Sequence, residues 1–454
     1  MTAVTAQPPP TPADAPAEPG WRARLRGGGA ALFPTAEPAA RPGWRAIALA
    51  LAAAAAGTAI SLARQPGAGA LDTVWAEDGQ VFLGQAVDNG PLPALGTSYA
   101  GYYHVVPRLV AGLASLAPAG AAAAVLAVTA ALLVAATAVL VHTASGAHLR
   151  SPLARTLAAA VVVVVPLAQD ELPNSIANLH WYGLYALFWM LVWTPRGRAG
   201  RVLAGAVVLA VAASDILTLV FVPLALARVL RRTPQGRRDR YGSTLAGLLG
   251  AGLALQVAGL ASGSSSRQLT PDPVLAASGF VLRAVPGALI GERWLGTGVD
   301  ARWLALAGLA WLLVAGAVLA AVLRLTRPHG VLAAVAGLHA AALYALPVLL
   351  SGTATFRYAA APAMLVVTAL AALLRPGTGT RGRLPLYALA ALLALVCAVN
   401  LRVDNPRAHG PRWSTELDRA RVACANGAER VALPIPPAGE DAWRANLPCD
   451  YVTG

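Results

Sequence analysis

The stretch WAEDGQVFLGQAVDNGPLPALGTSYAGYYHVVPR, residues 75–108, decides how the rest of this chain is interpreted. It follows the first long apolar segment and carries adjacent carboxylates, Glu77 and Asp78, in a chain of 454 residues with only 21 acids. Two neighbouring acids repel each other and lose hydration near a lipid surface. We therefore expect this pair either to face open water or to have a chemical role.

The composition is typical of a polytopic membrane protein. The chain is 57% hydrophobic and 12% charged, and its mean hydropathy is +0.59, which excludes a soluble enzyme. The net charge of +14 comes from arginines that cluster between apolar runs, where they orient membrane spans, so nucleic acid is not an expected partner. The chain has no lysine, which removes Schiff-base chemistry and a phosphate-loop lysine.

The arginine clusters also determine the predicted topology. Residues 1–44 are rich in Pro and Ala and are predicted to form a disordered cytoplasmic tail. Residues 103–117 are short for a span of roughly 20 residues and are interpreted as an interfacial helix on the outer surface. If they crossed the membrane instead, the clusters between 150 and 240 would lie outside, against the positive-inside rule. With 103–117 interfacial, every arginine cluster lies inside.

This interpretation predicts an all-α membrane domain over residues 45–401 with about eleven transmembrane helices. The C-terminus then lies outside the cell, and the protein is a multi-pass component of the cell (plasma) membrane with the lipid bilayer as its first partner. The predicted spans are 46–63, 119–142, 153–168, 179–195, 201–213, 216–230, 243–261, 302–324, 329–350, 357–374 and 384–401.

Residues 402–454 are predicted to form a small extracytoplasmic α/β module. A helix-like segment carries Trp413, Leu417 and Cys424 on one face and is followed by the strand-like run VALPI at 431–435. Cys424 and Cys449 both fall in this module, and an exported pair is most simply a disulfide. Two unrelated free thiols remain the alternative.

Polar residues form three clusters in the predicted outer loops. The first joins Glu77 and Asp78 to His104 and Arg108, and the second is QDELPNSIANLHW at 169–181, whose hydrogen-bonding groups suit a sugar or a metal ion. In the third, Arg357 enters a late span from outside and requires a local anion, for which a lipid phosphate is the obvious candidate. Helix capping, loop solvation and headgroup anchoring are the simpler explanations of the same residues.

Together these features resemble the GT-C superfamily of integral-membrane glycosyltransferases. They are outer-loop acids after the first span, two interfacial helices in that loop, a second acidic pair after the third span, and the motif R-Y-x-x-x-P at 357–362. The second acids lack the intervening residue of metal-binding members, so a divalent metal at that pair stays open and no cofactor is required. The acceptor is not carried over, because the small C-terminal module differs from the large soluble domains of that family.

The resemblance implies transfer of a sugar from a polyprenyl-phosphate donor to an extracytoplasmic glycan, lipid or protein, as in cell-wall biosynthesis. Asp78 would be the general base in an inverting displacement, with Glu77 as its neighbour or substitute. The implied donor- and acceptor-binding residues are Asp170, Glu171, Asn178, His180 and His104, and the implied phosphate-binding residues are Arg357, Arg108 and Tyr358. A transporter or flippase of lipid-linked sugars and a non-catalytic membrane scaffold are the alternatives; a transporter would need polar residues along a path through the membrane.

Overall fold

The computed structural model describes residues 27–34, 43–231, 239–261, 270–296, 298–377, 379–437 and 443–454. In this part of the chain six helices are long and apolar enough to cross a membrane. They are α2 (Trp44–Ala63), α6 (Ala122–Ala144, extended by short 3₁₀ turns to 119–147), α11 (Arg240–Ala261), α15 (Ala301–Val322), α16 (Gly330–Ser351) and the continuous segment η7 (Phe356–Ala359) with α17 (Ala360–Leu373).

The other five predicted spans are also helical but shorter. They are α7 (Pro152–Val164), α8 (Leu179–Val192), α9 (Arg198–Ala212), the segment η5 (Ile216–Phe221) with α10 (Val222–Leu230), and α18 (Leu384–Val399). Each has 10–17 residues, below the roughly 20 that a perpendicular span needs. The helices are therefore confirmed, while the number of eleven crossings stays a prediction.

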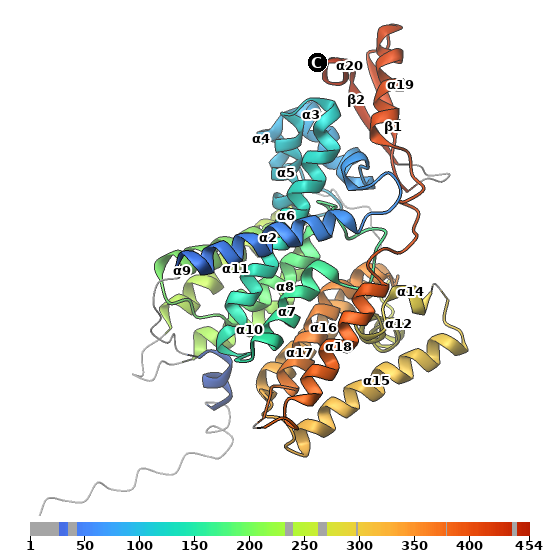
Figure 1. Cartoon of the computed structure of the whole chain (residues 1–454). Helices are drawn as coiled ribbons and strands as arrows, with labels where there is room; N and C mark the ends of the chain where they lie inside the picture. Colours follow the sequence, from blue (N-terminus) through green and yellow to red (C-terminus); the bar gives the residue numbers. More distant parts are fainter. Residues whose placement is uncertain are drawn as a thin grey trace, which may run out of the picture.

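Helix α8 and helix α17 lie inside the bundle. Both are apolar on all sides and nearly every residue is buried, as expected for central helices, whereas α2 and α15 expose most of their leucines. Helix α17 packs against α16, α7 and α8, and the ribbons of α16 and α17 run side by side (Figure 1). The N-terminal end of α17 is thereby held at the centre of one end of the bundle.

The first loop contains four short helices before the predicted interfacial helix. These are η1 (Ala70–Asp72), the π-helical turn η2 (Asp78–Leu83), α3 (Gly84–Asn89) and α4 (Pro91–Leu95). Helix α5 (Val105–Ser115) then buries Val110 and Ala114 and exposes Leu109, Leu113 and Leu116, which is the amphipathic pattern of an interfacial helix. Between α11 and α15 lie α12 (Pro273–Gly279), the π-helical turn η6 (Phe280–Ala284), α13 (Val285–Leu289) and α14 (Glu292–Leu295).

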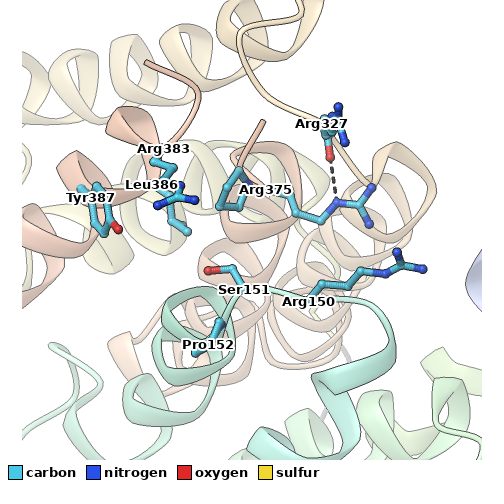
Figure 2. A pocket seen from close by; sticks show the side chains of 9 residues that line it. Arg150, Ser151, Pro152, Arg327, Arg375, Arg383, Leu386 and Tyr387 are labelled. Atoms are coloured by element: carbon cyan, nitrogen blue, oxygen red, sulfur yellow. Dashed lines mark hydrogen bonds between the residues drawn. The ribbon is translucent and has the colours of Figure 1, made fainter. Parts of the chain in front are cut away.

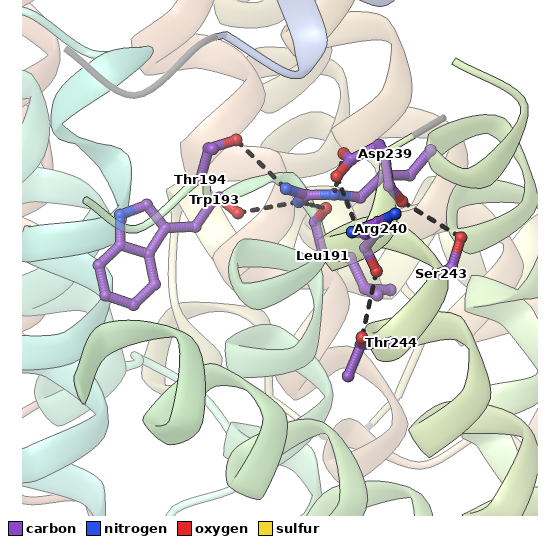
Figure 3. A network of polar contacts seen from close by, with 9 residues as sticks. Leu191, Trp193, Thr194, Asp239, Arg240, Ser243 and Thr244 are labelled. Atoms are coloured by element: carbon purple, nitrogen blue, oxygen red, sulfur yellow. Dashed lines mark hydrogen bonds and ion pairs between the residues drawn. The ribbon is translucent and has the colours of Figure 1, made fainter. Parts of the chain in front are cut away.

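A buried arginine, Arg228, links the ends of α8 and α10. The Arg228 guanidinium donates to the carbonyls of Leu191 and Trp193, the latter at 2.8 Å, and forms an ion pair with Asp239 at 3.5 Å. Figure 3 shows these contacts converging from three segments of the chain. Because the last carbonyls of a helix have no partner within that helix, Arg228 satisfies the open end of α8.

The tail folds as α19 (Trp413–Ala425), β1 (Arg430–Pro434), β2 (Arg444–Pro448) and α20 (Cys449–Thr453). The two strands pair antiparallel, with Ala432 opposite Asn446. The predicted disulfide between Cys424 and Cys449 is formed, with 5.6 Å between the Cα atoms.

The tail packs against the first loop. Its apolar residues, Leu433 and Ala445 among them, belong to the same core as the first loop. The carbonyl of Pro436 accepts from the N–H of Ala76 at 2.9 Å, and Arg430 pairs with Asp88 at 2.9 Å. The tail therefore holds the first loop, which carries Glu77 and Asp78, in place. It lies beside α3 at one end of the molecule (Figure 1).

Part of the N-terminal segment predicted to be disordered is helical. Residues 27–32 form a helical stretch that buries Leu32 and Phe33, and the Arg228 guanidinium lies 5.4 Å from the centre of the Phe33 ring. The Pro- and Ala-rich composition of residues 1–44 predicted disorder, but two buried apolar side chains are enough to dock this short stretch on the bundle. Residues 1–26 and 35–42 of that predicted tail lie outside the described residues.

Candidate functional site

A cavity of about 510 Å³ lies where the first loop meets the central helices. Its walls come from the start of η2, the 99–104 segment, the start of α8, the turn before η5, the end of α16 and the start of α17. The polar and aromatic lining residues are Glu77, Phe82, Tyr99, Tyr102, His104, Asn178, His180, Trp181, Asp215, Ser351, Arg357 and Tyr358. One cavity thus brings together members of all three clusters expected from the sequence.

The two adjacent acids have different surroundings. Glu77 lines the cavity, is half-buried, and has no hydrogen-bond or ion-pair partner among the described side chains. Asp78 is 1% exposed and does not line the cavity. Because η2 begins at this pair, the two side chains leave the backbone in different directions. The geometry therefore favours Glu77 over Asp78 as the acid that meets a substrate.

Asp78 instead holds the 169–178 loop in place. Its carboxylate accepts from the Ala177 N–H at 2.8 Å, the Ile176 N–H at 3.0 Å and the Ser175 hydroxyl at 3.2 Å. Burial raises the pKa of the Asp78 carboxyl to about 7, against the opposing effects of the Ala177 N–H and the Arg407 guanidinium. Asp78 therefore uses three hydrogen bonds to hold the 169–178 loop and does not line the cavity, which indicates a positioning role.

The local anion that Arg357 requires is present within the protein, where a lipid phosphate was the expected candidate. Its Nη1 atom donates to the Glu171 carboxylate at 2.6 Å, across 186 residues of sequence. The Arg357 side chain is still 32% exposed and lines the cavity, and Glu77 lies close enough to interact with it electrostatically. Glu171 therefore orients the Arg357 guanidinium by accepting from Nη1. The other nitrogens of this guanidinium remain available to a ligand.

The residues of the second acidic cluster also differ in whether they line the cavity. Asn178 lines the cavity and donates to the Glu171 carbonyl at 3.0 Å, whereas Asp170 does not line the cavity. Glu292 accepts from the Gln169 N–H at 3.0 Å and braces the loop from the other side, and burial raises its pKa to about 7. Among the residues that the structure describes, no three His, Cys, Asp or Glu side chains gather as metal ligands, so Asp170 and Glu171 do not form such a group.

Two rings that line the cavity, those of His180 and Trp181, have buried polar atoms. Both ring nitrogens of His180 and the indole N–H of Trp181 are buried without a partner in the described residues. His104, the third predicted polar ring, lies against Phe82 and Tyr102, with ring centres 5.4 and 4.1 Å apart. Aromatic faces with a few convergent polar groups are the usual lining of a small-molecule site.

Asp215 also lines the cavity, although it belongs to none of the three clusters expected from the sequence. One carboxylate oxygen accepts from the Leu217 N–H at 2.7 Å, but the other is buried with no partner among the described residues. Burial raises the pKa of this carboxyl to about 7, against the opposing effect of the Leu217 N–H. The sequence does carry a signal for Asp215, because an acid between two apolar segments is rare. Such an acid in a membrane protein is taken to be functional by default.

Arg108 does not reach the cavity, which corrects the expectation that it assists Arg357. It is buried behind Phe82, whose ring centre lies 5.4 Å from the guanidinium, and it donates to Gln85 at 2.9 Å. Helix α5 therefore turns this side chain into the loop and away from the cavity. Tyr358, by contrast, lines the cavity as expected, with its hydroxyl 3.4 Å from that of Ser351.

No protein-family model, curated protein or solved structure matches this chain.

Proposed function

We propose that the protein is a membrane glycosyltransferase that uses a polyprenyl-phosphate sugar and works at the outer surface of the cell membrane. The observation that carries the proposal is the cavity in which an unpaired carboxylate, Glu77, lies near a partly exposed arginine, Arg357. An acid that can accept a proton and a cation that can bind a phosphate are the two groups that this transfer needs.

The cavity also suits a donor that has a lipid tail. Leu260 and Leu350 form part of its wall and are 49% and 39% exposed, respectively, on helices that are long enough to span a membrane. An isoprenoid chain in the bilayer can therefore approach along an apolar surface while its phosphate enters a polar site. This arrangement makes a separate nucleotide-binding domain unnecessary.

The proposed reaction is a single displacement. The acceptor hydroxyl oxygen forms a bond to the anomeric carbon, and its proton passes to the Glu77 carboxylate. The bond between that carbon and the phosphate oxygen breaks, and polyprenyl phosphate leaves with the electron pair. Arg357 stabilises the negative charge that develops on this phosphate. The rings of His180 and Trp181 form part of the cavity wall against which the sugar would lie.

The test is turnover of synthetic polyprenyl-phosphate hexoses and pentoses by the purified full-length protein, followed as release of polyprenyl phosphate. Glu77→Gln keeps the size of the side chain and removes its basicity, so kcat should fall by about 10²-fold or more with little change in KM. Asp88→Asn is the matched control, because Asp88 lies on the same loop away from the cavity, and its solvent-exposed ion pair with Arg430 contributes little to stability.

Equal rates in the Glu77→Gln and Asp88→Asn variants would contradict a base at Glu77. If the wild type moves lipid-linked sugars across vesicle membranes without releasing polyprenyl phosphate, the transporter alternative replaces the enzyme. If it neither transfers nor moves them, the scaffold alternative is correct.

A further inference from the structure

A second cavity, of about 440 Å³, is lined by four arginines from three separate loops. Arg150 precedes α7, Arg327 precedes α16, and Arg375 and Arg383 lie on the connection between α17 and α18. Figure 2 shows these side chains around the start of α7, and in this view Arg150 and Arg375 extend in the same direction. We call this group the arginine pocket.

The arginine pocket lies at the opposite end of the bundle from the first cavity. Helix α16 starts just after Arg327 and ends at Ser351, which lines the first cavity. Helix α17 runs the other way, from Arg357 in the first cavity to Arg375. A helix of 22 residues is about 33 Å long, so the two sites are separated by about the thickness of a hydrocarbon core.

Among the residues that the structure describes, no acid pairs with the guanidinium groups of the arginine pocket. Residues 144–152, 323–330 and 374–384 contain no Asp or Glu. The Nε atom of Arg375 donates to the carbonyl of Arg327 at 2.8 Å, but no described residue pairs with the guanidinium groups of Arg150, Arg327 or Arg383. Burial together with the nearby Arg150 and Arg327 lowers the pKa of Arg375. Four like charges held together in this way attract an external anion.

Two helix N-termini add to the same field. Helix α7 starts at Pro152 and α18 at Leu384, and neither has a side-chain hydrogen bond at its N-cap. The first N–H groups of these helices therefore lack a side-chain acceptor and carry partial positive charge. Ser151 and the start of α18 line the arginine pocket, so the dipoles act in the same place as the guanidinium groups.

We propose that the arginine pocket binds a phosphate group at the membrane face opposite the first cavity. Guanidinium groups recognise phosphate oxygens with paired donors, and several of them suit a phosphate monoester or pyrophosphate. Tyr387, which lines the arginine pocket and is 53% exposed, continues into the apolar outer face of α18. A phosphate carried by a lipid fits this position best, and a soluble phosphate compound offers the same chemistry.

The experiment measures binding to the purified full-length protein. Native mass spectrometry with phosphatidic acid, and with phosphatidylcholine as the lipid of zero net charge, tests the lipid source. Calorimetry with inorganic pyrophosphate tests the soluble source. Tight binding of phosphatidic acid alone identifies a lipid phosphate, and binding of pyrophosphate with equal or higher affinity identifies a soluble one.

Matched double variants distinguish a specific phosphate site from general electrostatic attraction of an anion to a basic surface. Arg327→Ala with Arg383→Ala removes two residues that line the arginine pocket, and affinity should fall about tenfold or more. Arg324→Ala with Arg381→Ala removes the same charge from the same two loops at exposed positions outside the pocket, and affinity should fall less than about twofold. Replacing Arg327 and Arg383 by Lys should restore affinity only in part.

An equal loss in the two alanine pairs would overturn the proposal, and so would a wild type that prefers neither phosphatidic acid nor pyrophosphate. The Lys pair keeps the result decisive if the alanine pair fails to fold, because full affinity with Lys would exclude paired recognition. These measurements do not depend on transferase activity, so this proposal and the proposed function fail separately.

Discussion

Glu77 and Asp78 show how far the surroundings of two neighbouring side chains can differ. One faces a cavity without a partner, and the other is enclosed by the N–H groups of the 169–178 loop. An acid that lacks a partner can exchange a proton with a ligand, whereas an acid that accepts three hydrogen bonds is committed to them. The base of the proposed reaction is therefore Glu77, and Asp78 is a positioning residue.

Replacing Asp78 should affect stability more than chemistry. In Asp78→Asn an amide N–H₂ meets the Ala177 and Ile176 N–H groups, so at least one buried hydrogen bond is lost, at a cost of about 1–3 kcal/mol in the free energy of unfolding. Thermal unfolding in detergent should show a lowered Tm, while kcat of the folded fraction falls far less than in Glu77→Gln. A 10²-fold fall in kcat at an unchanged Tm would return the base to Asp78.

Asp215 should make donor binding depend on pH. With a pKa raised to about 7, this carboxyl is neutral below pH 7 and ionised above it, where it repels the donor phosphate in the same cavity. The KM for the donor should therefore rise as pH increases through about 7. Asp215→Asn cannot ionise, so its KM should stay flat from pH 6 to about pH 8, and a rise equal to that of the wild type would assign the titration to another group.

At the scale of elements, the 169–178 loop is the part that assembles the site. Asp78 holds it from the first loop, and Glu292 holds it from α14. Glu171 on this loop then orients Arg357 at the start of η7. Each of these contacts is made by a carboxylate from a different element. The position of Arg357 therefore depends on three chain segments.

Arg357 and Glu171 should have opposite effects on donor affinity. Arg357→Ala removes the phosphate contact and should raise the donor KM by about tenfold, and Arg357→Lys should recover only part of it because an ammonium cannot make the bidentate contact. Glu171→Gln should lower the donor KM, since the guanidinium then has no competing carboxylate. Steady-state kinetics on the three variants tests this, and an unchanged KM with Ala would reduce Arg357 to a headgroup anchor.

At the scale of the whole molecule, the two ends of the bundle carry different candidate sites. One end has the first cavity and the disulfide-linked tail, and the other has the arginine pocket. The tail contacts the first loop through the carbonyl of Pro436 and through Arg430, so it also keeps the acid-bearing loop in place. A polar site at each membrane face fits a protein whose substrates reach it from the bilayer.

Orientation in the membrane is the prediction that belongs to this scale. Reporter fusions after residue 240 should report the cytoplasm and fusions after residue 402 the exterior, because the arginine-rich connections favour the inside. Thiol labelling of non-reduced protein should find Cys424 and Cys449 blocked and Cys397 unpaired. A cytoplasmic C-terminus would contradict both the assignment of 103–117 as interfacial and the extracytoplasmic tail.

The two cysteines of the tail predicted the Cys424–Cys449 disulfide. Apolar runs and amphipathic repeats predicted helices at the eleven expected spans, the amphipathic α5 and a strand close to β1. These are local properties, since an apolar run or an amphipathic repeat is readable within a few turns of chain. Tertiary structure alone decided that Glu77 and not Asp78 faces the cavity, that Glu171 meets Arg357, and that Asp215 enters the same site. The physical reason is that the direction of a side chain at a π-helical turn, and a contact across 186 residues, depend on how the helices pack, which no local pattern encodes.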